Sequence, residues 1–257
     1  MRILISGDSH ADINHITSIY NKVEKFECDA AFVVGDYGFW PKAKNGLKFL
    51  NAIGDLDFPV YFLAGNHEDW DMLEKHVKSP YYKSIDENGF IEVHSNSFFA
   101  PTGHRWTWDG VKFMSVGGAY SIDRRARVKF VSWFPQETLT EEDVHACEPY
   151  GIEDAVPVDI MLSHDSPTCV NMEDVFLLAY GGFKTMDLDP GTDENREKLQ
   201  RIVNMNRPKK LIHGHWHISY KANIADLYGP GENLQVEGLN CNQNTDYFTV
   251  IDTEDWK

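Results

Sequence analysis

The sequence predicts an α/β protein built from two sheets that pack face to face, with helices outside. The first observation is that, in the N-terminal third, short apolar runs alternate with stretches whose apolar residues have helical spacing. The apolar runs lie at 2–6, 30–34 and 60–64, and the helical stretches at 12–26, 46–53 and 70–76. Short buried strands that alternate with helices are typical of βαβ units and a parallel sheet.

The second observation is a series of strand-like segments after residue 90, at 90–93, 97–100, 105–108 and 111–116. An Asp109-Gly110 pair between the last two is a hairpin signal. The third observation is a return to separate strands in the C-terminal half. Strands are expected at 157–163 and 210–213, two or three more within 234–252, and a helix at 194–205.

Composition limits the domain organisation and the classes of partner. The chain has 257 residues, 42% of them hydrophobic, which is ample for one domain spanning 1–257. An irregular insertion is expected at about 119–157, and a loop-rich segment at 165–194 is a candidate lid. The net charge of −16 disfavours long nucleic acid and anionic membranes as partners. No signal peptide or run of about 18 apolar residues is evident, so a cytoplasmic protein is expected.

Polar residues follow the ends of the buried strands. Three of the apolar runs end in glycine followed at once by Asp8, Asp36 or Asn66. In parallel sheets, ligands bind beyond the carboxyl ends of the strands, so separate loops deliver these side chains to one edge. The later strands lead into His164 and into His215-Trp216-His217. Carboxylates, amide oxygens and imidazoles are the groups that hold divalent metals in hydrolases.

Each of these motifs taken alone has an ordinary alternative. An Asp-x-His pair such as Asp8-Ser9-His10 is usually a surface feature, and a Gly-Asn-His-Glu turn is a weak signal. The four cysteines are far apart and form no C-x-x-C pair, so they are interpreted as free thiols. The joint occurrence of the motifs, each after an apolar strand, is the observation that indicates a metal site.

Five sequence blocks together resemble the calcineurin-like metallophosphoesterases. The blocks are Asp8-Ser9-His10, Gly35-Asp36, Gly65-Asn66-His67-Glu68, Ser163-His164 and Gly214-His215-Trp216-His217. The resemblance spans residues 3–217. It implies a four-layer α/β/β/α sandwich of two mixed sheets with flanking helices, and a dinuclear metal centre at one end.

The resemblance also implies the roles of the individual residues. The first metal would be held by Asp8, His10, Asp36 and His217, and the second by Asp36, Asn66, His164 and His215, with Asp36 bridging. His67 would face the substrate as a proton donor, and Glu68 would have a supporting role. The two ions are expected to be manganese, with iron or zinc as alternatives, because mixed Asp, Asn and His ligands suit all three.

The departures from the family pattern bear on the substrate. Phosphoprotein phosphatases carry an Asp and an Arg soon after the second block and an Arg after the third, and this chain has neither set. A phosphoprotein substrate is therefore disfavoured, and no residue is identified that would orient His67. Residues 35–41, 117–123 and 133–137 resemble the small phage and bacterial members, which are associated with phosphodiesters.

The expected function is hydrolysis of a phosphodiester in a small nucleotide, a cyclic nucleotide or similar, by attack of a metal-held hydroxide. Candidate substrate contacts are Arg124, Arg125, Arg127 and Tyr37. For the three arginines, an ordinary role as solvated charges of a loop is an equally good interpretation. A nuclease or RNA-debranching enzyme is the alternative function, because residues 163–167 also resemble RNA lariat debranching enzymes. A phosphomonoesterase ranks lower. A non-catalytic scaffold also ranks lower, since every ligand position and His67 are filled.

Overall fold

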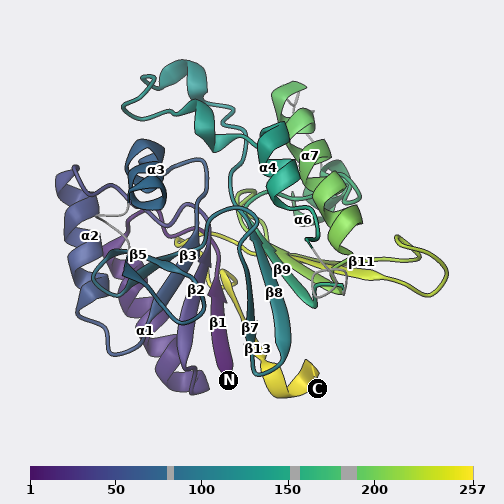
Figure 1. Ribbon diagram of the computed structural model, residues 1–257, viewed down its shortest axis with the longest axis horizontal. Coiled ribbons are helices and arrows are strands. Elements are labelled where there is room, and N and C mark those ends of the chain that lie inside the picture. The colour runs from purple at the N-terminus through teal and green to yellow at the C-terminus, as the bar shows by residue number, and fades with distance from the viewer. Residues whose placement is uncertain (80–83, 151–156, 181–189, 257) are drawn as a thin grey trace.

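The computed structural model describes residues 1–79, 84–150, 157–180 and 190–256. Two sheets stand side by side in the centre, with one group of helices against each outer face (Figure 1). This arrangement confirms the predicted α/β/β/α sandwich of two mixed sheets.

The first sheet carries the strands of the N-terminal third. Its order is β13 (Phe248–Asp252), β1 (Arg2–Ser6), β2 (Ala30–Val34), β3 (Val60–Leu63), β6 (Ser97–Phe99), β5 (Ile91–His94) and β4 (Ser84–Ile85). Strands β1, β2, β3 and β6 are parallel, whereas β13, β5 and β4 each pair antiparallel with a neighbour. The carboxyl ends of β1, β2 and β3 therefore meet at the same edge of this sheet.

The second sheet has the same kind of parallel centre. Its order is β11 (Tyr220–Ile224), β12 (Leu234–Gly238), β10 (Lys210–His213), β9 (Ile160–Ser163), β8 (Val111–Val116) and β7 (Arg105–Trp108). Strands β12, β10, β9 and β8 are parallel, and β7 and β11 pair antiparallel at the two edges. The turn between β7 and β8 has positive φ at both Asp109 and Gly110, as the hairpin signal predicted.

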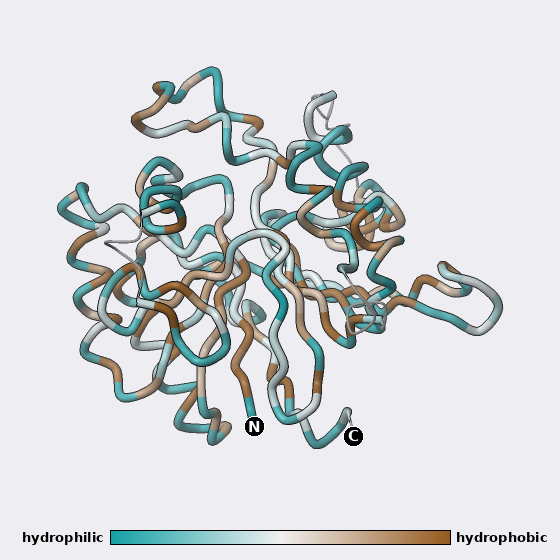
Figure 2. Tube along the Cα trace, in the orientation of Figure 1, coloured by the Kyte–Doolittle hydropathy of each residue, from teal (hydrophilic) through white to brown (hydrophobic). Residues whose placement is uncertain are grey.

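Three apolar layers hold the four structural layers together. One lies between the first sheet and the helices α1 (Ile13–Phe26), α2 (Lys44–Gly54) and α3 (Trp70–Lys78). The second lies between the sheets, where Phe32 stacks on Trp106 with 5.7 Å between ring centroids. The third joins the second sheet to α4 (Glu141–Ala146), α6 (Met172–Tyr180) and α7 (Pro190–Asn206). Figure 2 shows the hydrophobic residues gathered along the central strands.

The candidate lid segment, 165–194, contains more helix than its sequence indicated. Its residues 172–180 form α6, and Pro190 begins α7 rather than lying in a loop. A proline is well tolerated in the first turn of a helix because the missing N–H has no partner there in any case. Residues 181–189 lie outside the described part of the chain, so the lid itself stays a prediction.

The expected insertion at 119–157 is mostly irregular where it is described. It contains the short helices η1 (Arg124–Ala126) and η2 (Pro135–Glu137) before α4, and residues 151–156 lie outside the description. Among the described residues, no helix has both the length and the apolar composition needed to span a bilayer. The last helical turn, η3 (Thr253–Trp256), follows β13.

Candidate metal centre

The residues singled out by the sequence lie at the carboxyl ends of five strands from both sheets. Strands β1, β2 and β3 of the first sheet lead to Asp8 and His10, to Asp36, and to Asn66 and His67. Strands β9 and β10 of the second sheet lead to His164, and to His215 and His217. The candidate centre is thus assembled where the two sheets meet.

One group of donor atoms surrounds the buried carboxylate of Asp8. Its Oδ2 lies 2.9 Å from Nε2 of His217 and 3.7 Å from Nε2 of His10. The two imidazole nitrogens are themselves 3.2 Å apart. Three ligand-type atoms at this spacing form a set that could hold one metal ion.

A second group surrounds His164. Its Nε2 lies 3.0 Å from Oδ1 of Asn66 and 3.4 Å from Oδ1 of Asp36. The other ring nitrogen, Nδ1, lies 2.9 Å from the carbonyl oxygen of Val34, a partner that can only accept a hydrogen bond. In the neutral imidazole Nδ1 therefore carries the proton, and the lone pair of Nε2 faces two oxygen acceptors. Such a convergence of lone pairs is satisfied by a cation, so the donor set fits a divalent metal.

Asp36 lies between the two groups. Its Oδ1 faces His164 as described, and its Oδ2 is 3.8 Å from Nδ1 of His10. His215, the remaining candidate ligand, has its ring centroid 5.0 Å from that of His164. The backbone N–H of His215 also donates to Oδ1 of Asp8 at 3.0 Å, which ties the two groups together.

Four of these side chains are carried on left-handed backbone. The φ angles are +48° at His10, +45° at Asp36, +66° at His215 and +53° at His217. Left-handed backbone is costly for residues with a Cβ, and such strain persists where the surroundings enforce it, often at functional sites. The fold therefore imposes the directions of these candidate ligands against the local preference of the chain.

Two glycines are required by the close packing of the centre. At Gly35, where φ is +92°, an added Cβ would lie 2.1 Å from Nδ1 of His164. At Gly214 it would lie 2.2 Å from Oδ1 of Asp8. Real Cβ atoms do not approach other atoms this closely, so a side chain at either position would displace a ligand.

The ionisation of the cluster is also typical of a cation site. Burial alone would raise the pKa of Asp36, but His164, His67 and His10 hold it below the usual aspartate value. Hydrogen bonds to Asp8 and to the sulfur of Cys241 raise the pKa of His217 to about 10. The Asp8 carboxylate thus favours a proton on His217, and a metal ion would compete with that proton.

A sequence model described as calcineurin-like phosphoesterase matches residues 1–219, which contain the whole centre. The chain belongs to the calcineurin-like phosphoesterases. These are hydrolases that act on phosphoesters and use divalent metals, which agrees with the donor set described above.

No curated protein matches the chain. Among solved structures, this phosphoesterase is similar to TT1561 of Thermus thermophilus, with a TM-score of 0.56 and 14% identity over 100% of this chain and 96% of that one. It also matches an archaeal phosphodiesterase, with a TM-score of 0.43 and 10% identity over 100% and 96% of the two chains. A third match is the NAD nucleotidase NadN of Haemophilus influenzae, with a TM-score of 0.47 and 12% identity over 98% of this chain and 49% of that one. At 14% identity the likeness to TT1561 concerns the fold alone.

Glu68 joins two of the ligand loops in this phosphoesterase. Its side chain is fully buried, and its two oxygens accept hydrogen bonds from the backbone N–H groups of Gly38, at 2.9 Å, and Gly65, at 2.7 Å. Burial and the Asp36 carboxylate raise the pKa of Glu68 to about 8, while the two N–H donors stabilise its charged form. The residue therefore fixes the loop after β2 against the loop after β3.

Two tryptophans hold the Asn66–His67 turn from outside. The indole N–H of Trp40 donates to the carbonyl oxygen of His67 at 2.8 Å, and that of Trp70 donates to Gly65 at 3.0 Å. A third indole, that of Trp216, donates to Oδ1 of Asp165 at 2.9 Å. Sequence reasoning gave no role to Asp165, although the residue directly follows a ligand.

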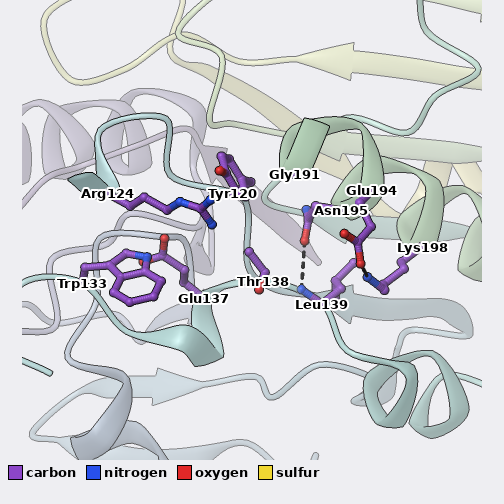
Figure 3. Close-up of a pocket in the computed structure, with 10 residues that line it drawn as sticks. All are labelled: Tyr120, Arg124, Trp133, Glu137, Thr138, Leu139, Gly191, Glu194, Asn195 and Lys198. Carbon is purple, nitrogen blue, oxygen red and sulfur yellow. Dashed lines mark hydrogen bonds and ion pairs between the residues drawn. The ribbon is translucent and has the colours of Figure 1, made fainter. Parts of the chain in front are cut away.

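The four candidate substrate contacts have different positions. Arg127 is nearly buried and bonded to the Asn66–His67 turn, whereas Arg125 is exposed. Arg124 stacks over Tyr120, with 4.4 Å to the ring centroid, beside a separate cavity of about 270 Å³ (Figure 3). The three arginines therefore do not form one phosphate-binding group.

The structure contradicts the expectation that Tyr37 contacts the substrate. The residue is fully buried, stacks on Phe62 with 4.2 Å between centroids, and bonds through its hydroxyl to Ser97. It packs in the apolar layer under α2, because the chain after Asp36 turns back into the core. Tyr37 is therefore in no position to contact a substrate.

A cavity of about 330 Å³ opens over the candidate ligands. One side is formed by His10, His67, His215 and His217, and the rest includes Ile122, Phe176, Thr192 and Trp216. The rings of Phe176 and Trp216 meet edge to face with 5.9 Å between centroids. The cavity thus combines a polar floor of metal-ligand type with an apolar wall.

Proposed function

We propose that this calcineurin-like phosphoesterase is a phosphodiesterase that uses two metal ions, manganese being the expected metal, and hydrolyses a phosphodiester of a small nucleotide. The observation that carries the proposal is the cavity itself, in which convergent ligand-type atoms face an apolar, aromatic wall. A phosphoryl group would lie over the ligands and a nucleobase or similar ring against the wall.

The chain's residues divide into two sets in this proposal. Asp8, His10 and His217 would hold one ion, Asn66, His164 and His215 the other, and Asp36 would contact both. When bound, such ions neutralise phosphoryl oxygens and make a water molecule more acidic. His67, whose backbone N–H donates to Oδ1 of Asp36 at 2.8 Å, would donate a hydrogen bond to the leaving oxygen.

The size and lining of the cavity favour a small substrate. About 330 Å³ is at the lower end of the usual range for small-molecule pockets. Phe176 and Trp216 offer aromatic surface, on which a base stacks without the need for a specific hydrogen-bond pattern. Thr192 contributes a buried hydroxyl with no hydrogen-bond partner among the described residues, so it is available to a polar group of the ligand.

A nuclease or debranching enzyme is the second candidate function. The positive charges that such an enzyme needs are less well provided by the residues around the cavity. Such an enzyme needs cationic side chains along the path of a polyanion. Arg127 uses its guanidinium on neighbouring protein groups, and Arg124 lies beside the other cavity. The net charge of −16 also disfavours the binding of a long polyanion.

The proposal is tested by a substrate panel with the purified protein and added manganese, iron or zinc. The panel contains bis-p-nitrophenyl phosphate, 2′,3′- and 3′,5′-cyclic nucleotides, p-nitrophenyl phosphate and a single-stranded oligonucleotide. We expect turnover of the diesters and cyclic nucleotides, lost in Asp36→Asn and reduced about 10²- to 10⁴-fold in His67→Gln. The variant Glu141→Gln, at an exposed ion pair with Arg201, is the matched control. Preferential turnover of the monoester or the oligonucleotide would reject the proposal.

A further inference from the structure

The guanidinium of Arg127 is built into the turn that carries Asn66 and His67. Only 9% of its side chain is exposed, although it comes from the irregular insertion. Its Nη1 lies 3.4 Å from Nδ1 of His67, and the same nitrogen donates to the carbonyl oxygens of Asn66 at 3.2 Å and Ser132 at 2.9 Å. Arg127 is therefore part of the support of the centre and not a free cation.

The contact with His67 has one consequence for the position of its proton. Nη1 has two N–H groups and three acceptors, so one N–H is shared between two of them. Because a guanidinium has no acceptor, Nδ1 of His67 is the acceptor in the contact at 3.4 Å. Nδ1 then carries no proton, and the ring proton lies on Nε2. The ring lines the cavity, and Nε2 has no hydrogen-bond partner among the described residues.

We propose that Arg127 is a positioning residue that fixes His67 as the Nε2–H tautomer and directs this N–H into the cavity. The proposal rests on the proposed function for the role of His67, and it adds the residue that orients it. A hydrogen-bond donor would then face the leaving oxygen of the substrate before the substrate arrives. Such preorganisation is effective because no reorientation is needed during the reaction.

The same guanidinium also contacts Ser121, which bonds to the neighbouring expected ligand Asn66. Nη2 of Arg127 hydrogen-bonds to the hydroxyl oxygen of Ser121, and the side-chain amide of Asn66 donates to that oxygen at 3.0 Å. With its NH₂ group held by Ser121, Asn66 presents its carbonyl oxygen to His164. Ser121 thus holds the amide of Asn66, and Arg127 contacts both Ser121 and His67.

Two carboxylates keep the buried charge of Arg127 paired. Nε lies 3.0 Å from Oδ1 of Asp123, and Nη2 lies 3.5 Å from both carboxylate oxygens of Glu137. Glu137 is fully buried, and Figure 3 shows it between Trp133 and Thr138 at the edge of the second cavity. A buried cation needs such partners, and their presence makes the guanidinium a fixed element of the site.

The first test measures the tautomer directly in the wild-type protein. Long-range ¹H–¹⁵N NMR of histidine-labelled, zinc-loaded protein distinguishes a protonated ring nitrogen from an unprotonated one, and His67→Gln assigns the signal. We expect Nδ1 of His67 to be unprotonated and Nε2 protonated. A protonated Nδ1 would overturn the proposal, and this readout is independent of any substrate.

The second test measures kinetics on bis-p-nitrophenyl phosphate at saturating metal. We expect Arg127→Met to lower kcat about 10- to 100-fold with KM nearly unchanged, and Arg127→Lys, which keeps a donor, to recover part of the loss. The double variant Arg127→Met/His67→Gln should be no slower than His67→Gln alone, because Arg127 acts through His67. Losses that multiply in the double variant would refute the proposal. Arg201→Met, at an exposed ion pair, is the control.

The two tests separate the possible failures. If the wild type hydrolyses no diester, the proposed function fails, while the NMR signals of His67 in the wild type and in Arg127→Met still decide whether Arg127 sets its tautomer. If Arg127→Met does not fold, the wild-type spectrum and the Arg127→Lys variant remain decisive. A His67 spectrum unchanged in Arg127→Lys and Arg127→Met, with full activity in both, would show that the contact has no positioning role.

Discussion

Removal of the Glu68 carboxylate should loosen two of the ligand loops at once. This carboxylate is the buried acceptor for the N–H groups of Gly38 and Gly65. Gly38 lies two residues after Asp36, and Gly65 lies directly before Asn66. In Glu68→Ala both N–H groups lose their acceptor in the interior. The loops after β2 and β3 then lose the group that holds them together.

The magnitude is set by the two hydrogen bonds. With its pKa at about 8, Glu68 is mostly neutral at pH 7. A buried N–H left without an acceptor costs about 1–3 kcal/mol, so the loss of both acceptors in Glu68→Ala should lower the free energy of unfolding by about 2–6 kcal/mol. Glu68→Gln keeps one acceptor oxygen and should lose about half as much. Because Gly38 and Gly65 belong to ligand loops, metal affinity should fall about 10- to 100-fold in the variants that fold.

The assay is urea unfolding of the metal-free protein, followed by calorimetric titration with manganese. The control is Glu141→Gln, which removes an exposed contact with Arg201 and should change stability by no more than about 1 kcal/mol. If Glu68→Ala matches that control in both stability and metal affinity, the reasoning that Glu68 fixes the ligand loops is refuted.

Three further outcomes are expected. Gly35→Ala should lower the free energy of unfolding by about 1–3 kcal/mol more than Gly110→Ala, and it should abolish metal binding. Both glycines have positive φ, but only at Gly35 would the added Cβ meet a candidate ligand, His164. Equal losses of the two variants in urea unfolding would contradict this. Burial lowers the pKa of His15 to about 4, so the unfolded chain binds more protons between pH 6.5 and 4 and stability falls on acidification, by up to about 3 kcal/mol. Unfolding at pH 7 and 4.5 should show a smaller loss in His15→Gln. Removal of the metal by a chelator should lower the melting temperature in a thermal scan, since a metal at 100 times its Kd adds about 2.7 kcal/mol to the free energy of unfolding. In His217→Ala the chelator should change the melting temperature little.

Arg127 shows why the supporting residues of the centre could not be predicted from the sequence. Residues 124–127 contain three arginines in similar local surroundings, and nothing in the spacing separates them. In the structure Arg127 contacts His67, Arg124 lies over Tyr120 and Arg125 is exposed. The difference arises because the insertion packs against the Asn66–His67 turn from a distance of about 60 residues along the chain.

The class of the fold was predicted from the sequence pattern, and the set of expected ligands from the family resemblance of five short blocks. Buried strands have a distinct apolar pattern, and parallel strands bring the residues after their carboxyl ends to one edge, so Asp8, Asp36 and Asn66 were predicted as neighbours from local information. The tertiary structure decided that His164 and His217 join them from a second sheet, that Tyr37 turns into the core, and that α6 is a helix. These features depend on contacts between segments far apart in the chain, where packing and hydrogen bonding outweigh local preference.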